Sequence, residues 1–280
     1  MSFRRSVLRH IAYALMLALP LMGLAASAHA EADGLPGPDQ PEARGLAIAK
    51  ETDKLNTGWG DSEAKMEMVL SNAQGDKSTR ELRFYGLERP DPNEGDWSLI
   101  VFDKPRDVDG TALLTHAKVL EPDDQWLYLP AVKRVKRISS VNKSGPFVGS
   151  EFAFEDFSSN EVGKYSYNWL RDEPCGDLTC HVVERKPLYD HSGYTRQVVW
   201  TDTKDYQPRK IDYYDRKNAL LKTLTLSDYH LYEGKYWRAR DLYMVNHTNK
   251  KATRLIWKDY KFNTGLTEAD FSTTALKRAR

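Results

Sequence analysis

The sequence lacks the motifs that mark most enzymes. It has no G-x-S-x-G nucleophile elbow, no H-E-x-x-H metal motif and no glycine-rich phosphate loop. The histidines after residue 30 are scattered, and close carboxylate pairs such as Asp123-Asp124 fall at predicted turns, where they are solvated. These absences favour a protein that is not an enzyme and that uses no metal or other cofactor. A hydrolase or isomerase with an unrecognised site stays open as a lesser alternative.

The sequence also lacks an excess of one charge. It has 41 basic and 40 acidic side chains, and the first thirty residues hold three of the basic ones and no acidic one. The remainder therefore carries a net charge of about −2. A near-neutral chain has no broad positive field, which argues against a nucleic acid as its partner.

Long apolar runs are missing after residue 30, where no stretch approaches the roughly 20 apolar residues that span a bilayer. Residues 1–30 are different. They begin with three arginines, continue through an apolar run over residues 11–26 and end in the small-residue sequence Ala28-His29-Ala30, which is typical of a cleaved export signal. We predict a periplasmic protein, exported by either the general secretory or the twin-arginine route.

The chain has only two cysteines, Cys175 and Cys180, with four residues between them. In an oxidising compartment this spacing predicts a local disulfide that closes a loop between two strands. His181 and His191 lie nearby but complete no known zinc pattern, and the spacing is not the C-x-x-C of redox-active pairs.

Helical periodicity is confined to the start of the mature chain. Residues 31–41 are rich in proline and glycine and predict a flexible leader, and residues 42–55 predict one amphipathic helix. About a dozen alternating segments follow, joined mostly by short turns, which requires antiparallel neighbours. So many strands must curl or close. We therefore predict a single mainly β domain over residues 42–280, with a strongly curved antiparallel sheet and an N-terminal helix.

One long connection, residues 139–164, is too apolar for a solvated loop. It carries Phe147, Phe152, Phe154 and Phe157 among glycines and serines. These side chains must pack against the sheet or against a ligand. The sequence leaves open whether the connection plugs a barrel mouth or forms a lid over an apolar cavity.

A set of apolar residues is the candidate lining of such a cavity. The first predicted hairpin projects two methionines to one face, and methionine adapts well to irregular ligands, although a packed core would use the same residues. With the aromatic residues of residues 126–128 and of the long connection, the predicted ligand-binding set is Met66, Met68, Leu82, Phe84, Trp126, Tyr128, Phe147, Phe152 and Phe154.

A short basic run consists of Lys133, Arg134, Lys136 and Arg137. On an edge strand, such side chains prevent unwanted pairing with other sheets. Alternatively, they form a docking patch for anionic lipid head groups or for an acidic partner. The sequence does not choose between these two interpretations.

Several of these segments together resemble a known family. Residues 111–114, 126–138, 144–157 and 266–271 resemble the outer-membrane lipoprotein-sorting protein family, the LolA/LolB-like group found beside RND-type (MMPL) exporters. The resemblance extends over roughly residues 57–272. The cysteine pair is not part of the family pattern.

The resemblance implies an incomplete β-barrel of about eleven antiparallel strands, with helices and lid segments over an apolar cavity. It also implies a carrier or adaptor for a lipid, a lipid-linked molecule or lipoprotein acyl chains, with an RND-type exporter as a possible partner. We expect a monomer that touches membrane surfaces transiently. The alternative is a non-enzymatic envelope scaffold whose barrel is filled by its own side chains.

Overall fold

The computed structural model describes residues 34–279 except residues 90, 92, 93, 120 and 160. Leu35–Arg280 form one compact unit, while the predicted export signal, residues 1–30, lies outside the described residues. Within the described part, none of the helices combines the length and apolar character needed to cross a membrane.

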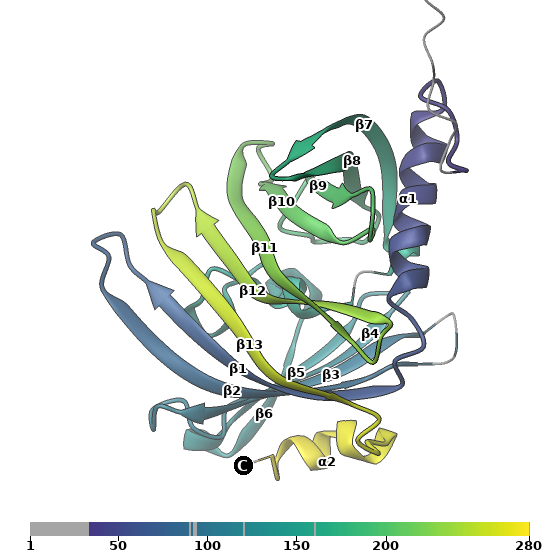
Figure 1. Cartoon of the computed structure of the whole chain (residues 1–280). Coiled ribbons are helices and arrows are strands. Elements are labelled where there is room, and N and C mark those ends of the chain that lie inside the picture. The colour runs from purple at the N-terminus through teal and green to yellow at the C-terminus, as the bar shows by residue number, and fades with distance from the viewer. Residues whose placement is uncertain (1–33, 90, 92–93, 120, 160, 280) are drawn as a thin grey trace, which may run out of the picture. The chain divides into compact units, whose positions relative to one another are not determined.

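A single antiparallel sheet makes up most of this unit (Figure 1). Its strand order is β6-β5-β4-β3-β2-β1-β13-β12-β11-β10-β9-β8-β7. The two end strands do not pair with each other, so the barrel is open, as predicted. The strands are β1 (Asp61–Ser71), β2 (Lys77–Leu87), β3 (Glu94–Lys104), β4 (Ala112–Lys118), β5 (Asp124–Leu129), β6 (Arg134–Ile138), β7 (Tyr165–Cys175), β8 (Leu178–Pro187), β9 (Arg196–Asp202), β10 (Pro208–Tyr214), β11 (Leu220–Tyr232), β12 (Tyr236–Asn246) and β13 (Ala252–Phe262).

The sheet has thirteen strands, more than the eleven or so that the resemblance implies. The basic run forms the extra edge strand β6, and every alternating segment after residue 165 pairs with its neighbour in the chain. One long-range pairing, β1 with β13, joins the two halves of the sheet. This pairing lets the sheet curve into two walls, one containing β1–β5 and the other β7–β11 (Figure 1).

The predicted N-terminal helix is α1 (Pro41–Leu55), which runs beside the edge strand β7 (Figure 1). Pro41 suits the first turn of a helix, where its missing N–H is not needed. Gly45 lets the helix approach β7 closely, because a Cβ atom there would lie 2.9 Å from the backbone nitrogen of Trp169. The helix therefore covers one edge of the sheet.

Short helical turns occupy the connections and the C-terminus. Between β6 and β7 lie η2 (Ser140–Asn142), η3 (Phe147–Gly149), η4 (Phe154–Phe157) and η5 (Val162–Lys164), after η1 (Pro130–Val132) has joined β5 to β6. The chain ends with η6 (Glu268–Phe271) and α2 (Thr273–Leu276).

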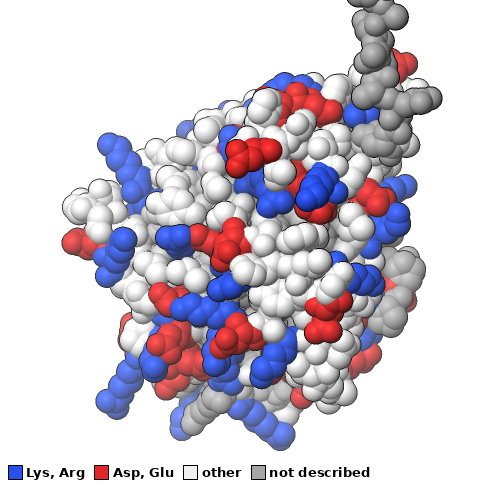
Figure 2. Space-filling model, in the orientation of Figure 1, with Lys and Arg blue, Asp and Glu red and all other residues white. Residues whose placement is uncertain are grey.

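The convex face of β1, β12 and β13 is charged, and its charges are paired. Figure 2 shows basic and acidic side chains side by side over these strands. The Nζ atoms of Lys258 and Lys261 lie 2.9 Å from carboxylate oxygens of Glu67 and Glu63. Exposed pairs of this kind add little stability. They do make this face of the strands water-compatible, while alternation sends the apolar residues to the concave face.

A second apolar cluster lies on the convex face of β3, β4 and β5. The C-terminal cap, which we define as residues 266–276, covers this convex cluster. Phe271 and Leu276 of the cap are completely buried. His116 stacks on Trp97 with ring centroids 3.9 Å apart and contacts the backbone oxygen of Phe271 through Nε2 at 2.7 Å.

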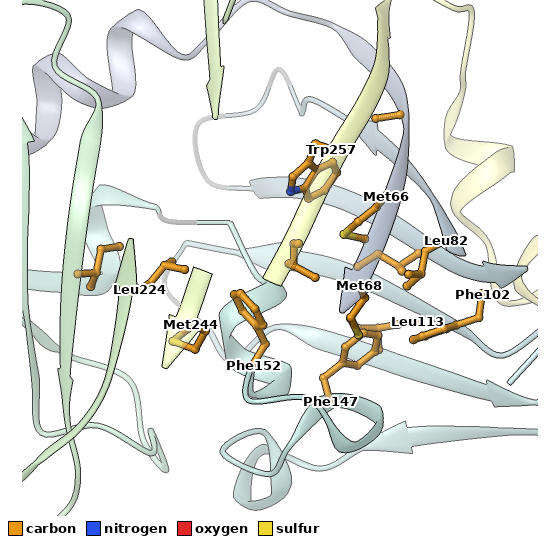
Figure 3. Close-up of a cluster of buried hydrophobic side chains, with 14 of the residues drawn as sticks. Met66, Met68, Leu82, Phe102, Leu113, Phe147, Phe152, Leu224, Met244 and Trp257 are labelled. Carbon is orange, nitrogen blue, oxygen red and sulfur yellow. The ribbon is translucent and has the colours of Figure 1, made fainter. Parts of the chain in front are cut away.

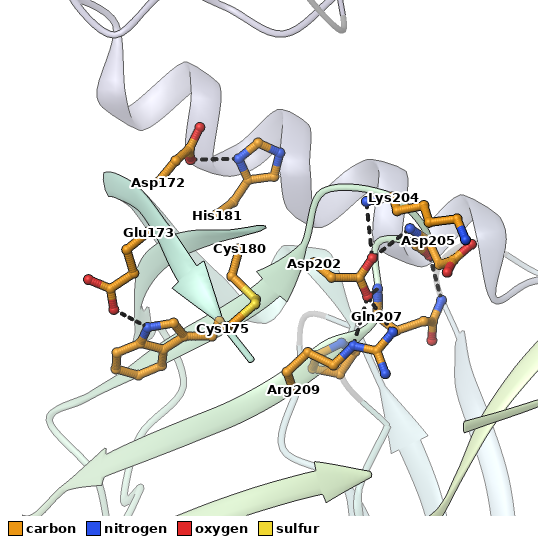
Figure 4. Close-up of a disulfide and its surroundings, with 12 residues drawn as sticks. Asp172, Glu173, Cys175, Cys180, His181, Asp202, Lys204, Asp205, Gln207 and Arg209 are labelled. Atoms are coloured by element: carbon orange, nitrogen blue, oxygen red, sulfur yellow. Dashed lines mark hydrogen bonds and ion pairs between the residues drawn. A yellow bond between two sulfur atoms is a disulfide. The ribbon is translucent and has the colours of Figure 1, made fainter. Parts of the chain in front are cut away.

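The predicted disulfide is present and joins the adjoining ends of β7 and β8 (Figure 4). The Cα atoms of Cys175 and Cys180 are 5.8 Å apart. Nearby, Asp202 is fully buried, and its carboxylate accepts hydrogen bonds from the turn that follows β9 and from Arg209. These contacts fix the hairpins of this wall.

Candidate functional site

The concave face carries one continuous cluster of buried apolar side chains, which we call the concave cluster (Figure 3). It draws side chains from both walls, and it includes all three methionines that follow residue 30. Its labelled members in Figure 3 include Met66, Met68, Leu82, Phe102, Leu113, Leu224, Met244 and Trp257. Three unbranched, polarisable side chains make this surface adaptable in shape.

The aromatic segment, which we define as residues 144–157, is packed into the concave cluster (Figure 3). Phe147 is completely buried and Phe152 is only 3% exposed. The ring of Phe147 lies 4.5 Å from that of Phe157 and 5.6 Å from that of Phe102, measured between centroids. The segment therefore covers part of the concave face with its own side chains.

A buried ion pair holds the aromatic segment to the wall that contains β11. A carboxylate oxygen of Asp156 lies 2.7 Å from Nζ of Lys222, and both side chains are about 95% buried. Lys222 also donates to the backbone oxygen of Glu151, at 3.0 Å, and the hydroxyl of Tyr194 donates to Asp156, at 2.9 Å. Because each charge has several partners, the cost of burying the pair is offset.

A second buried carboxylate, Glu155, fastens the segment to the β8–β9 connection. It accepts hydrogen bonds from the hydroxyl of Ser192 at 2.9 Å and from the backbone N–H of Gly193 at 2.8 Å. Burial and the nearby charge of Asp156 raise the pKa of this carboxyl. Two adjacent acidic residues thus hold the segment on the same wall.

The opposite wall holds the segment through neutral contacts and through one arginine. Gln125 of β5 donates to the backbone oxygen of Phe154 at 2.9 Å, and Arg80 of β2 donates to the backbone oxygen of Val148. The hydroxyl of Thr253 in β13 accepts a hydrogen bond from the backbone N–H of Glu151 at 2.9 Å. The segment therefore bridges both walls, so any motion of it must break contacts on each side.

Away from the aromatic segment, the concave face is lined by aromatic rings. The rings of Phe84 and Trp257 meet edge to face at 5.1 Å, and Tyr260 stacks on Trp257 at 5.5 Å. Trp257 is 9% exposed, and its indole nitrogen has no hydrogen-bond partner among the described residues. Phe84 and Tyr260 remain partly accessible, so this stretch offers apolar surface that the segment does not cover.

Charged groups lie at this same end of the sheet. The guanidinium of Arg238 contacts the rings of Tyr236 and Phe262, and desolvation lowers its pKa. Burial, together with the nearby carboxylates of Glu161 and Glu88, raises the pKa of Asp96 to about 7. The apolar surface near Trp257 is therefore bordered by two poorly solvated ionisable groups, Arg238 and Asp96.

Seven of the nine predicted ligand-binding residues come together in or against the concave cluster: Met66, Met68, Leu82, Phe84, Phe147, Phe152 and Phe154. The prediction is wrong for Trp126 and Tyr128, which pack in or against the convex cluster. The reason is strand alternation, because Leu127 between them faces the concave cluster. Alternation correctly puts both aromatic residues of β5 on one face, but it does not predict whether that face is concave or convex.

The basic run forms the edge strand β6, in agreement with the first interpretation. Pairing with β5 places Arg137 opposite Trp126, and Arg137 forms an ion pair with Asp124. Arg134 and Lys136 alternate to the other face, and Lys133 precedes the strand with a left-handed φ of 51°. The four cations therefore do not all lie on one face of β6, and docking stays a prediction for Lys133, Arg134 and Lys136.

Sequence reasoning missed the second wall and the polar contacts that hold the segment. Alternation in β10 to β12 predicts that Ile211, Leu224 and Met244 each lie on the apolar face of their own strand. It does not predict that these faces lie on the same side of the sheet as the apolar face of β1. The acidic pair Glu155-Asp156 gave a signal, because two carboxylates beside buried phenylalanines need partners. The partner Lys222 lies 66 residues away in the sequence.

Comparisons with known proteins agree with this architecture. A family model described as "uncharacterized protein" matches residues 94–278. The crystal structure of a domain assigned by name to outer membrane lipoprotein sorting, from Vibrio parahaemolyticus, is 52% identical, with a TM-score of 0.82. The match covers 86% of this chain and 100% of that one. This chain belongs to the outer-membrane lipoprotein-sorting protein family.

Two further structures extend the likeness of this lipoprotein-sorting family member. A DUF1329 family protein from Desulfovibrio piger is 30% identical with a TM-score of 0.80, covering 84% of this chain and 99% of that one. A LolA superfamily protein from Nitrosomonas europaea is 19% identical with a TM-score of 0.66, covering 82% and 98%, and shows the shared fold. No curated protein matches the sequence.

Proposed function

We propose that this protein is a non-enzymatic periplasmic carrier or adaptor that binds the acyl chains of a lipid, a lipid-linked molecule or a lipoprotein. One observation carries the proposal: apolar side chains of both walls, with all three methionines after residue 30, face one another across the concave face. Acyl chains bind such a surface favourably in water, because burying each methylene contributes about 0.8 kcal/mol of binding free energy.

The aromatic segment acts as the lid in this proposal. Its phenylalanines occupy the concave cluster in the absence of cargo, and an acyl chain replaces them when the segment moves aside. The partly accessible rings near Trp257 provide further apolar surface for the acyl chain. The Vibrio parahaemolyticus relative supports this function, because it is assigned by name to lipoprotein sorting.

Delivery toward the outer membrane requires partners. We propose an RND-type exporter of the inner membrane as the donor of cargo and brief contact with membrane surfaces, with the protein working as a monomer after removal of residues 1–30. Lys133, Arg134 and Lys136 at the open edge β6 are the remaining candidates for docking an acidic surface, since Arg137 is paired with Asp124.

Native mass spectrometry of the protein, isolated from periplasm without detergent, tests the proposal. We expect a bound species that solvent extraction releases as a lipid of defined mass. A second function, an envelope scaffold with a self-filled barrel, is favoured by the complete burial of Phe147. A clean apo mass, with no uptake from envelope lipid extract, would favour the scaffold and reject the carrier.

A further inference from the structure

A groove of about 580 Å³ follows the outer side of the aromatic segment. Residues 149–153 of the segment form one wall. The other walls come from the β10–β11 turn, with Arg216 and Lys217, and from the β12–β13 turn, with Asn249 and Lys251. The groove therefore lies where the segment meets the hairpin ends of the sheet.

Three cations line this groove without a carboxylate partner in the part of the chain that the structure describes. Arg216 donates to the backbone oxygen of Ser192 at 3.1 Å and to the hydroxyl of Ser144 at 3.3 Å, so its guanidinium is held in place by neutral oxygens. Lys217 and Lys251 are exposed. This differs from the convex face, where cations are paired with carboxylates (Figure 2).

The acidic residues of the groove offset only part of this positive charge, because its three cations that lack a carboxylate partner among the described residues outnumber the two carboxylates of Glu151 and Asp215. The carboxylate of Glu151 accepts hydrogen bonds from the side-chain amides of Asn246 at 2.7 Å and of Asn249 at 3.3 Å. Asp215 accepts from the backbone N–H groups of Lys217 and Ala219 within its own turn. Lys222 is neutralised by Asp156. The groove therefore keeps an excess of positive charge that can attract an anion.

The floor of the groove is apolar and continuous with the concave cluster. Phe152, Tyr194 and Leu221 line the groove and also belong to, or pack against, that cluster. A molecule seated on the cations therefore lies next to the side chains that close the concave face. This combination of unpaired cations and an adjoining apolar floor suits an amphiphile with an anionic head.

We propose that this groove is the head-group site of the carrier and binds the phosphate-bearing head of an anionic lipid. The proposal rests on the proposed function and deepens it by naming the cargo class. Arg216, Lys217 and Lys251 contact the phosphate, and the first methylenes of the chain lie against Phe152. Displacement of Phe152 then opens the concave cluster to the rest of the chain.

Isothermal titration with soluble short-chain lipids tests the site on the full mature protein. The probes are dihexanoylphosphatidylglycerol, dihexanoylphosphatidylcholine and inorganic phosphate. We expect the phosphatidylglycerol to bind most tightly. Lys217→Glu/Lys251→Glu should weaken its binding about tenfold or more, since each lysine near an anionic head group contributes about fivefold in affinity. Lys50→Glu/Lys204→Glu, with the same change of net charge outside the groove, should change affinity less than about twofold.

Three outcomes overturn this inference. The first is equal binding of the two lipids, and the second is phosphatidylglycerol binding that the groove variant leaves unchanged. The third is phosphate binding as tight as lipid binding, which identifies a free-anion site. Lys217→Gln/Lys251→Gln, expected to show a smaller loss in the same direction, replaces the reversal variant if that variant does not fold. Retention of acyl cargo without head-group preference rejects only the groove, whereas head-group binding without acyl uptake rejects the carrier function.

Discussion

Two non-strand segments close opposite faces of the same sheet, and they do so by different means. The C-terminal cap covers the convex cluster mainly with aliphatic and aromatic packing around Phe271 and Leu276. The aromatic segment covers the concave cluster with equally buried rings, and it adds buried charges, Glu155 and Asp156, each with several partners. Among the described residues, the cap adds only the contact of His116 with the backbone oxygen of Phe271 and an exposed ion pair between Arg89 and Glu268, whereas the aromatic segment depends on a buried ion pair. We therefore expect the aromatic segment to be the closure that can open.

The largest expected effects come from truncating the central ring of each closure. Phe147→Ala and Phe271→Ala each remove a completely buried ring, so each should lower the free energy of unfolding by about 3–5 kcal/mol. Urea denaturation measures this loss. Only Phe147→Ala should alter the amount of lipid retained in native mass spectra. Equal effects of both variants on lipid retention would erase the distinction between the two closures.

The next largest effect concerns the buried ion pair. Lys222→Met leaves Asp156 buried without its cation and should cost about 3 kcal/mol of stability. Lys258→Met, which breaks the exposed pair with Glu67, is the matched control and should cost no more than about 1 kcal/mol. Hydrogen exchange should rise in residues 144–157 of the first variant and stay unchanged in the C-terminal cap. Faster exchange of the cap would show that the two closures are not independent.

The disulfide should matter to stability and not to either closure. Cys175→Ala/Cys180→Ala opens a loop of few residues, so the expected loss is about 2 kcal/mol in the free energy of unfolding. Lipid retention at a temperature where the variant stays folded should equal that of the wild type. Alkylation with and without reductant checks that the native pair is oxidised.

The smallest effect, taken per pH unit, is a pH dependence at the far end of the concave face. The pKa of Asp96 is raised to about 7, so the folded state binds more protons than the unfolded state between about pH 4 and pH 7. The free energy of unfolding therefore falls as the pH rises through this window. Asp96→Asn should abolish that contribution, so its stability relative to the wild type should rise by about 1 kcal/mol for each pH unit through this window. Parallel pH curves for the two proteins would contradict this assignment.

Most of the fold follows from the sequence, because alternation and short turns leave antiparallel pairing as the only economical choice. The helix ending at Leu55, the edge position of residues 134–138 and the disulfide all follow from local rules. Local rules do not predict which side of each strand becomes concave, or which distant strands lie opposite one another. Trp126 and Tyr128 therefore went to the wrong face, and Lys222 was not connected to Asp156.

The central claim is that the aromatic segment gates the concave cluster, and a reversible lock on the segment tests it most directly. Glu151→Cys/Thr253→Cys is designed to link the segment to β13 by a disulfide, since the backbone nitrogen of Glu151 lies 2.9 Å from the hydroxyl of Thr253. Alkylation with and without reductant checks that the bond has formed. Native mass spectrometry after incubation with envelope lipid extract should show no lipid uptake by the oxidised variant. Reductant should restore uptake to that of the wild type under the same conditions. Equal uptake by the oxidised and reduced forms would contradict the claim that the segment is the gate.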